Sequence, residues 1–135
     1  MSPFPEQLIP ATITSSHRDL EPGQTATLTV SLTNTFDEEI ILTFPTSCQA
    51  IVFIRDSRGR VTTPADGEYL CARVPSSLQL AAGETKTFAT EWGGGVQFGA
   101  AGTSERVPPG SYYASGELRA DGYTAIAFPI LIVVH

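Results

Sequence analysis

An alternation of apolar and polar positions is most regular in residues 25–34, which read TATLTVSLTN. Every second position in this segment is apolar: Ala26, Leu28, Val30 and Leu32. A repeat of two places such side chains on one face of a β-strand, whereas a helix would distribute them around its circumference. The pattern therefore predicts a half-buried strand in which Leu28 and Val30 face inward and Thr29 faces outward.

Similar segments recur along the chain, separated by tight turns and by two longer loops. The predicted strands are residues 11–16, 25–34, 40–44, 49–56, 77–80, 85–92, 111–119 and 123–134. Glycine and proline interrupt residues 61–77 and 93–110, so we expect loops there, the first with at most one short strand. This order predicts an all-β protein: an immunoglobulin-like, antiparallel Greek-key β-sandwich of seven or eight strands, formed as one domain by residues 1–135.

The composition argues against several classes of partner. The 135 residues have a formal net charge of −6 and little clustered Lys or Arg, which argues against a nucleic-acid-binding protein. No apolar run approaches the roughly 20 residues that cross a bilayer, so we expect no membrane insertion. The first ten residues, MSPFPEQLIP, lack the basic start and apolar core of a secretory signal. We therefore expect a cytoplasmic protein, and a monomer; an exported protein whose signal has been removed is the alternative.

Residues with catalytic or metal-binding chemistry are few. His17 and His135 are the only histidines, and neither is close in sequence to a cysteine or to carboxylates with the spacing of metal ligands. No G-x-S-x-G sequence surrounds a serine, and no histidine is placed to act as its base. We therefore predict a non-enzymatic protein with no catalytic residues, no metal and no cofactor.

The two cysteines, Cys48 and Cys71, leave two alternatives open. They either form a disulfide that stiffens a loop of about 23 residues or remain as two buried thiols in a reducing cytoplasm. In either case we expect them to approach each other, because the chain turns after Phe44-Pro45. Their Cα atoms should then lie within about 7 Å, the upper reach of a disulfide.

Three segments carry a recognisable order of strands and turns. They read SLTNTFDEEIILTFPTSCQAIVFIRDSRGRV, LAAGETKTFATEW and VPPGSYYASGEL. A strand ending in Thr-Asn, a second ending in Phe-Pro, an Ala-Gly-Glu turn before Phe and Trp, and Pro-Gly before an aromatic strand resemble the intracellular proteinase inhibitor (BsuPI-type) domain family. The resemblance covers residues 25–135. It implies an immunoglobulin-like sandwich of bacterial origin that inhibits a cytoplasmic subtilisin-like serine protease.

The resemblance also implies that loops at one end of the sandwich contact the protease. A substrate-like inhibitor presents an extended, exposed segment, and subtilisin-like enzymes favour large apolar side chains in their primary pocket. Two segments are candidates for such a contact with the protease, residues 68–71 and residues 95–99. Their candidate contact residues are Tyr69, Leu70, Gln97 and Phe98. We favour the first segment, because Gly95 and Gly99 are expected to leave the second too mobile to bind without a large ordering cost.

A second function, of a different class, fits the same sequence. The chain is alternatively a structural or adhesive immunoglobulin-like module of a larger surface assembly, without inhibitory activity. Export and a formed disulfide would favour this alternative, whereas a subtilisin-type protease in the same cytoplasm would favour inhibition.

Overall fold

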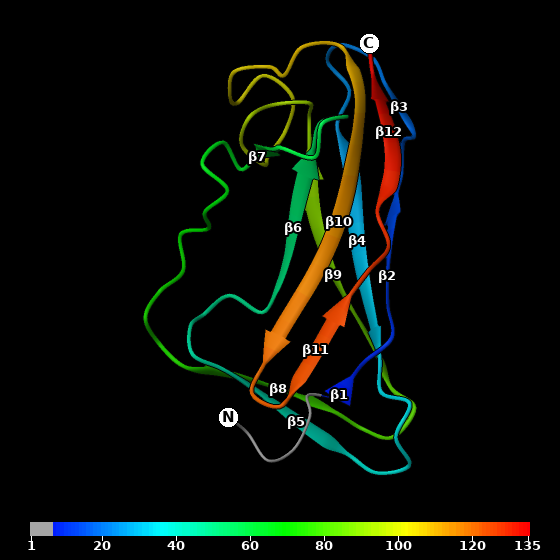
Figure 1. The fold of residues 1–135 in the computed structure, drawn as a ribbon, viewed down its shortest axis with the longest axis vertical. Coiled ribbons are helices and arrows are strands. Elements are labelled where there is room, and N and C mark those ends of the chain that lie inside the picture. Colours follow the sequence, from blue (N-terminus) through cyan, green and yellow to red (C-terminus); the bar gives the residue numbers. More distant parts are fainter. Residues whose placement is uncertain (1–6) are drawn as a thin grey trace.

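The structure, a computed structural model that describes residues 7–135, has two layers of β-strands packed face to face (Figure 1). One layer contains β6, β10, β11 and β12, and the other contains β2, β4 and β9. The strands are β1 (Gln7–Leu8), β2 (Ala11–Ser15), β3 (Asp19–Leu20), β4 (Ala26–Thr33), β5 (Ile40–Phe44), β6 (Ala50–Arg55), β7 (Val61–Thr63), β8 (Ser76–Leu80), β9 (Thr85–Trp92), β10 (Gly110–Ala120), β11 (Tyr123–Ile126) and β12 (Ile130–Val134). The predicted antiparallel sandwich is confirmed.

β10 is the centre of the first layer. It pairs antiparallel with β6 on one side and with both β11 and β12 on the other. The second layer has β4 at its centre, between β2 and β9, again antiparallel. β5 and β8 form a separate two-stranded sheet at one end of the molecule (Figure 1).

The core lies between the inward faces of β4 and β10. Leu28 and Val30 of β4 are almost completely buried, whereas Thr29 is half-buried, so the predicted face of this strand is confirmed. On β10 the inward residues are Tyr112, Ala114, Gly116, Leu118 and Ala120. Burial of such apolar side chains between two sheets is the main stabilising contribution to a sandwich.

Two aromatic residues complete the end of the core near the 93–110 loop. Trp92 is fully buried, and its indole N–H donates to the carbonyl oxygen of Gly95 at 2.8 Å. Tyr112 packs edge-on against Trp92, and its hydroxyl donates to the carbonyl oxygen of Pro108 at 2.5 Å. Both rings therefore fill the core while their polar atoms remain hydrogen-bonded.

The prediction of one buried strand over residues 123–134 is wrong in its middle. Glu117 pairs with Ile126 and Ala114 pairs with Ile130, so three residues, 127–129, lie opposite two residues of β10. Pro129 has no N–H to donate to the ladder, which favours such an interruption. Phe128 is consequently 91% exposed instead of buried. The short strands β1 and β3 were also not predicted, and they bring the described residues to twelve strand segments.

We predict that Leu28→Ala lowers the free energy of unfolding by about 2–5 kcal/mol, because it removes buried volume between the sheets. Thr29→Ala, on the adjacent outward position, serves as the control and should change stability by less than about 1 kcal/mol. Urea denaturation of both variants measures the difference. A larger loss for the threonine variant would contradict the orientation of β4.

Candidate functional site

The connection between β7 and β8 runs outside the edge of the first layer, beside β6 (Figure 1). We call residues 64–75 the 64–75 loop. Residues 68–72 contain no turn or bend. At the middle of this stretch Leu70 has a relative exposure of 103%, so its side chain projects entirely into solvent. An apolar side chain in that position stabilises nothing within the described fold, which makes it a candidate contact residue.

Tyr69 holds the loop on the side that precedes Leu70. Its hydroxyl accepts the N–H of Val52 at 2.9 Å and donates to the carbonyl oxygen of the same residue. β7 pairs only with Ile54 and Arg55, so Val52 lies on an edge of β6 that no strand covers. The Tyr69 ring also packs edge-on against Phe53 and stacks on Phe98.

The environment of the Tyr69 phenol changes its chemistry. Burial raises its pKa to about 12, although the hydrogen bond from Val52 acts in the opposite direction. The phenol therefore remains neutral at physiological pH, as a donor to the Val52 carbonyl requires. Tyr69 is an anchor rather than the exposed contact residue that the sequence suggested.

A second set of contacts holds the loop on the side that follows Leu70. Cys71 is joined to Cys48 by a disulfide, with the two Cα atoms 5.5 Å apart. This distance lies inside the 7 Å expected from the sequence. Next to the disulfide, the N–H of Ser47 donates to the carbonyl oxygen of Ala72 at 3.0 Å, and the N–H of Ala72 donates to Ser47 Oγ at 2.8 Å. Leu70 is thus exposed between two fixed neighbours.

The second candidate segment is less exposed than the sequence suggested. Gln97 is exposed, but Phe98 is partly buried against the core and stacks on Tyr69 at a ring distance of 6.1 Å. The glycines that were expected to make this loop mobile are hydrogen-bonded to the fold. The carbonyl oxygen of Gly95 accepts two hydrogen bonds, from Thr63 Oγ1 and from the Trp92 indole, and the N–H of Gly99 donates to Glu91. Its main effect is to support Tyr69 through Phe98.

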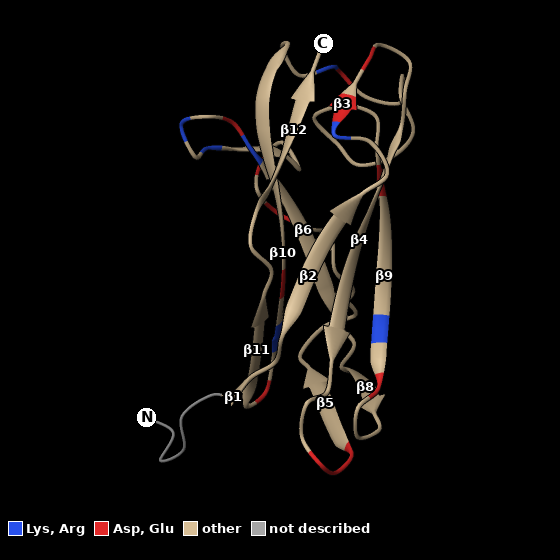
Figure 2. Cartoon of the chain, turned by 90° about the vertical axis from the view of Figure 1, so that its right-hand side faces the viewer, with Lys and Arg blue, Asp and Glu red and all other residues tan. Residues whose placement is uncertain are grey.

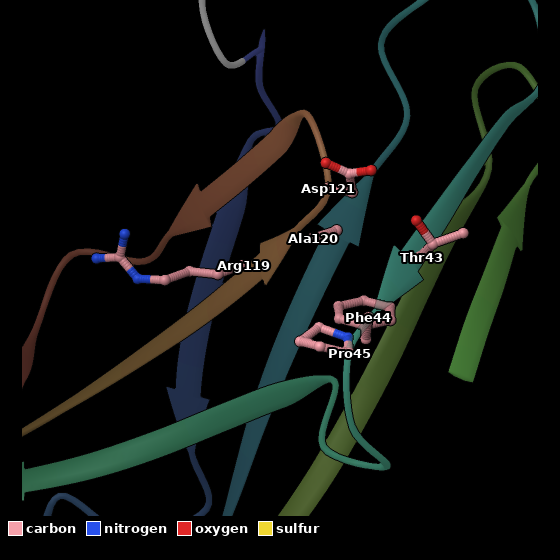
Figure 3. A pocket seen from close by; sticks show the side chains of 6 residues that line it. All are labelled: Thr43, Phe44, Pro45, Arg119, Ala120 and Asp121. Atoms are coloured by element: carbon pink, nitrogen blue, oxygen red, sulfur yellow. The ribbon is translucent and has the colours of Figure 1, made fainter. Parts of the chain in front are cut away.

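The larger pockets carry no catalytic arrangement. One of about 490 Å³ lies between the end of β5 and the turn after β10, lined by Thr43, Phe44, Pro45, Arg119, Ala120 and Asp121 (Figure 3). In that view the guanidinium of Arg119 points away from Asp121, so the two charges do not converge on one point. A pocket of about 590 Å³ between β1 and the 127–129 interruption is almost entirely apolar.

Charged residues lie mostly in loops and turns, and the strands carry few (Figure 2). Within residues 7–135 no three His, Cys, Asp or Glu side chains gather closely enough to hold a metal ion. The same part of the chain contains no helix with the length and apolar character needed to cross a membrane.

A family model for the intracellular proteinase inhibitors, BsuPI, matches residues 13–123 of this chain. The match covers most of the chain, and it includes the 64–75 loop and both of its anchors. The chain therefore belongs to the intracellular proteinase inhibitor family. No curated protein sequence matches it.

Solved structures with the same fold share little sequence with this chain. The CARDB domain of a Pyrococcus furiosus protein has a TM-score of 0.52 at 13% identity, over 98% of this chain and 97% of that one. The C-terminal domain of wzt has a TM-score of 0.53 at 11% identity, over 93% and 70% of the two chains. A β-glucosidase from Erythrobacter marinus has a TM-score of 0.54 at 16% identity over 92% of this chain, which spans only 15% of the enzyme. At these identities the similarity establishes the fold alone.

The sequence suggested Leu70 and the cysteines as candidates but did not indicate the residues that hold this part of the chain in place. Val52 contributes backbone atoms, which carry no sequence signal, and Ser47 is an ordinary serine next to a cysteine. The one available signal was the length of β6 relative to β7. A six-residue strand beside a three-residue strand leaves part of its edge to be covered by another group.

We predict that Tyr69→Phe destabilises the protein by about 1–3 kcal/mol at neutral pH, because the N–H and carbonyl of the buried Val52 lose their partner. The ring contacts with Phe53 and Phe98 are retained in this variant. Urea denaturation measures the loss.

The raised pKa of Tyr69 adds a pH dependence with a definite sign. In the unfolded chain the phenol ionises near 10.0, whereas in the folded protein it stays protonated to about 12. Its contribution to stability is therefore complete below pH 10 and declines as the pH rises toward 12. In Tyr69→Phe this part of the decline should be absent. An identical pH profile for parent and variant would contradict the buried position of the phenol.

Proposed function

We propose that this chain inhibits a subtilisin-like serine protease by presenting Leu70 to the primary pocket of the enzyme. The observation that carries this proposal is the full exposure of Leu70 between two anchored neighbours, in a stretch, residues 68–72, without a turn or bend. Membership of a proteinase inhibitor family supports a protease as the partner.

The energetic argument rests on pre-organisation. A flexible peptide loses conformational freedom on binding, at a cost of about 1–2 kcal/mol for each residue whose backbone is fixed. In the 64–75 loop, Tyr69, Cys71 and Ala72 are already held on the fold. Binding therefore removes less conformational entropy from this loop than it would from a flexible peptide. The protein acts by binding and carries out no chemistry of its own. The family description, intracellular proteinase inhibitor, favours action inside the cell with a protease as the partner.

The structural or adhesive module remains the second candidate, and a specific observation favours it. Leu8 and Phe128 are 76% and 91% exposed, and both line the apolar pocket beside the 127–129 interruption. Exposed apolar surface of this kind is typical of contacts between proteins. β1 and this pocket lie across β10 from β6, so the two candidate surfaces can be tested independently.

We predict that Leu70→Asp weakens inhibition of a subtilisin-like protease by about 30-fold or more, the effect expected when a residue central to an interface is lost. Leu8→Asp is the matched control, because it places the same charge on an exposed leucine elsewhere on the surface. It should inhibit as well as the parent. Both substitutions are at exposed sites, so both variants should be as stable as the parent within about 0.5 kcal/mol.

Inhibition constants, measured with a chromogenic peptide substrate, decide between the two functions. Equal inhibition by the parent and Leu70→Asp would place the contact surface outside the 64–75 loop. Absence of inhibition by the folded parent would reject the inhibitory function, and association of the parent that Leu8→Asp abolishes would then favour the structural module.

A further inference from the structure

The disulfide occupies a particular position relative to the exposed leucine. Cys71 directly follows Leu70, so the peptide bond that a protease would attack, Leu70–Cys71, lies next to the covalent link. Cys48 and Cys71 are both half-buried, and both line a pocket of about 210 Å³ at the edge of β6. A reductant therefore has a route to the sulfur atoms from solvent.

We propose that the Cys48–Cys71 disulfide is a redox switch that determines whether the 64–75 loop inhibits the protease or is cleaved by it. The inference rests on the proposed function and concerns the regulation of the same site. With the disulfide closed, the loop is a lasting inhibitor. With the disulfide opened by a dithiol, the protease cleaves the Leu70–Cys71 bond and dissociates.

Cleavage follows ordinary serine protease chemistry. The serine Oγ of the enzyme attacks the carbonyl carbon of Leu70, and the Cys71 amine leaves with a proton from the enzyme's histidine. Water then hydrolyses the ester, which gives a Leu70 carboxylate and a free Cys71 amino group. Opening of the switch requires two electrons and two protons from the dithiol, which itself becomes a disulfide.

The closed disulfide opposes completion of this reaction. After the bond is cut, Cys71 remains covalently attached to Cys48 and Ala72 remains hydrogen-bonded to Ser47, so the new amino group stays near the Leu70 ester. On the other side Tyr69 holds Leu70 through Val52. Because both ends are retained at high effective concentration, the bond can re-form faster than the products separate.

Opening the disulfide separates Cys71 from Cys48, so the covalent attachment of Cys71 to the fold is then the five-residue segment 71–75 that leads into β8. Within this segment, two hydrogen bonds between Ser47 and Ala72 also hold the chain, and both residues lie at the surface. Each hydrogen bond of this kind contributes little net stability against water. The new amino terminus can then leave the site, and hydrolysis of the Leu70 ester becomes irreversible.

The test compares the oxidised parent with a variant that carries both Cys48→Ser and Cys71→Ser. Each protein, in molar excess over the enzyme, is incubated with a subtilisin-like protease. The residual protease activity is then followed with time. Mass spectrometry of the same samples locates any cut. The parent should inhibit throughout the incubation. Inhibition by the double variant should last for at most about one tenth of that time, with cleavage between residues 70 and 71, because residue 71 is no longer linked to residue 48.

Circular dichroism shows whether the double variant is folded. Where it is not, the folded parent treated with graded dithiothreitol, with its free thiols counted, gives the same comparison between closed and open forms. Val74→Ser, in a third protein that retains the disulfide, controls for a change elsewhere in the loop and should behave as the parent.

Equal persistence of inhibition by the closed and open forms would overturn the switch while leaving the proposed inhibition intact. Loss of inhibition without a cut between Leu70 and Cys71 would also overturn it. A parent that fails to inhibit at the first time point would reject the proposed function and, with it, the switch.

Discussion

The close approach of the two sheets at Gly116 is the constraint on which the rest of the structure depends. A Cβ atom at this position would lie 2.6 Å from Cγ2 of Val30, well inside the contact distance of two carbon atoms. β10 can therefore pack on β4 only because position 116 has no side chain, and Ala114 keeps the neighbouring inward position small. This contact sets the distance between the layers, and the larger residues Leu28 and Leu118 fill the space on either side.

The position of the candidate site follows from this contact through a short chain of interactions. β10 pairs with β6 over six residues, which places the uncovered backbone of Val52 at the edge of the layer. Tyr69 binds that edge through its side chain, and the side chain of the next residue, Leu70, is fully exposed. The disulfide on the other side completes the restraint. The sandwich thus holds a short exposed segment in place, as is general for loops that bind partners.

The sequence predicted those features that depend on local patterns. The alternation in residues 25–34 identified β4 and its inward face, and the turn residues located most strand boundaries. It did not predict features that depend on distant partners. The bond between Tyr69 and Val52 requires knowledge of which strand edge is uncovered, and the spacing of Cys48 and Cys71 is compatible with both a disulfide and free thiols. Phe128 was misassigned because an apolar run interrupted by Pro129 resembles a continuous buried strand.

The central claim is that the 64–75 loop is the surface that meets the protease. Hydrogen–deuterium exchange of the protein, alone and with a subtilisin-like protease whose catalytic serine has been replaced, tests this claim directly. The account predicts that slowed exchange on binding is concentrated in residues 64–75 and in the adjoining segment around Ser47. Slowed exchange confined to β1 and residues 126–129, with residues 64–75 unchanged, would contradict it.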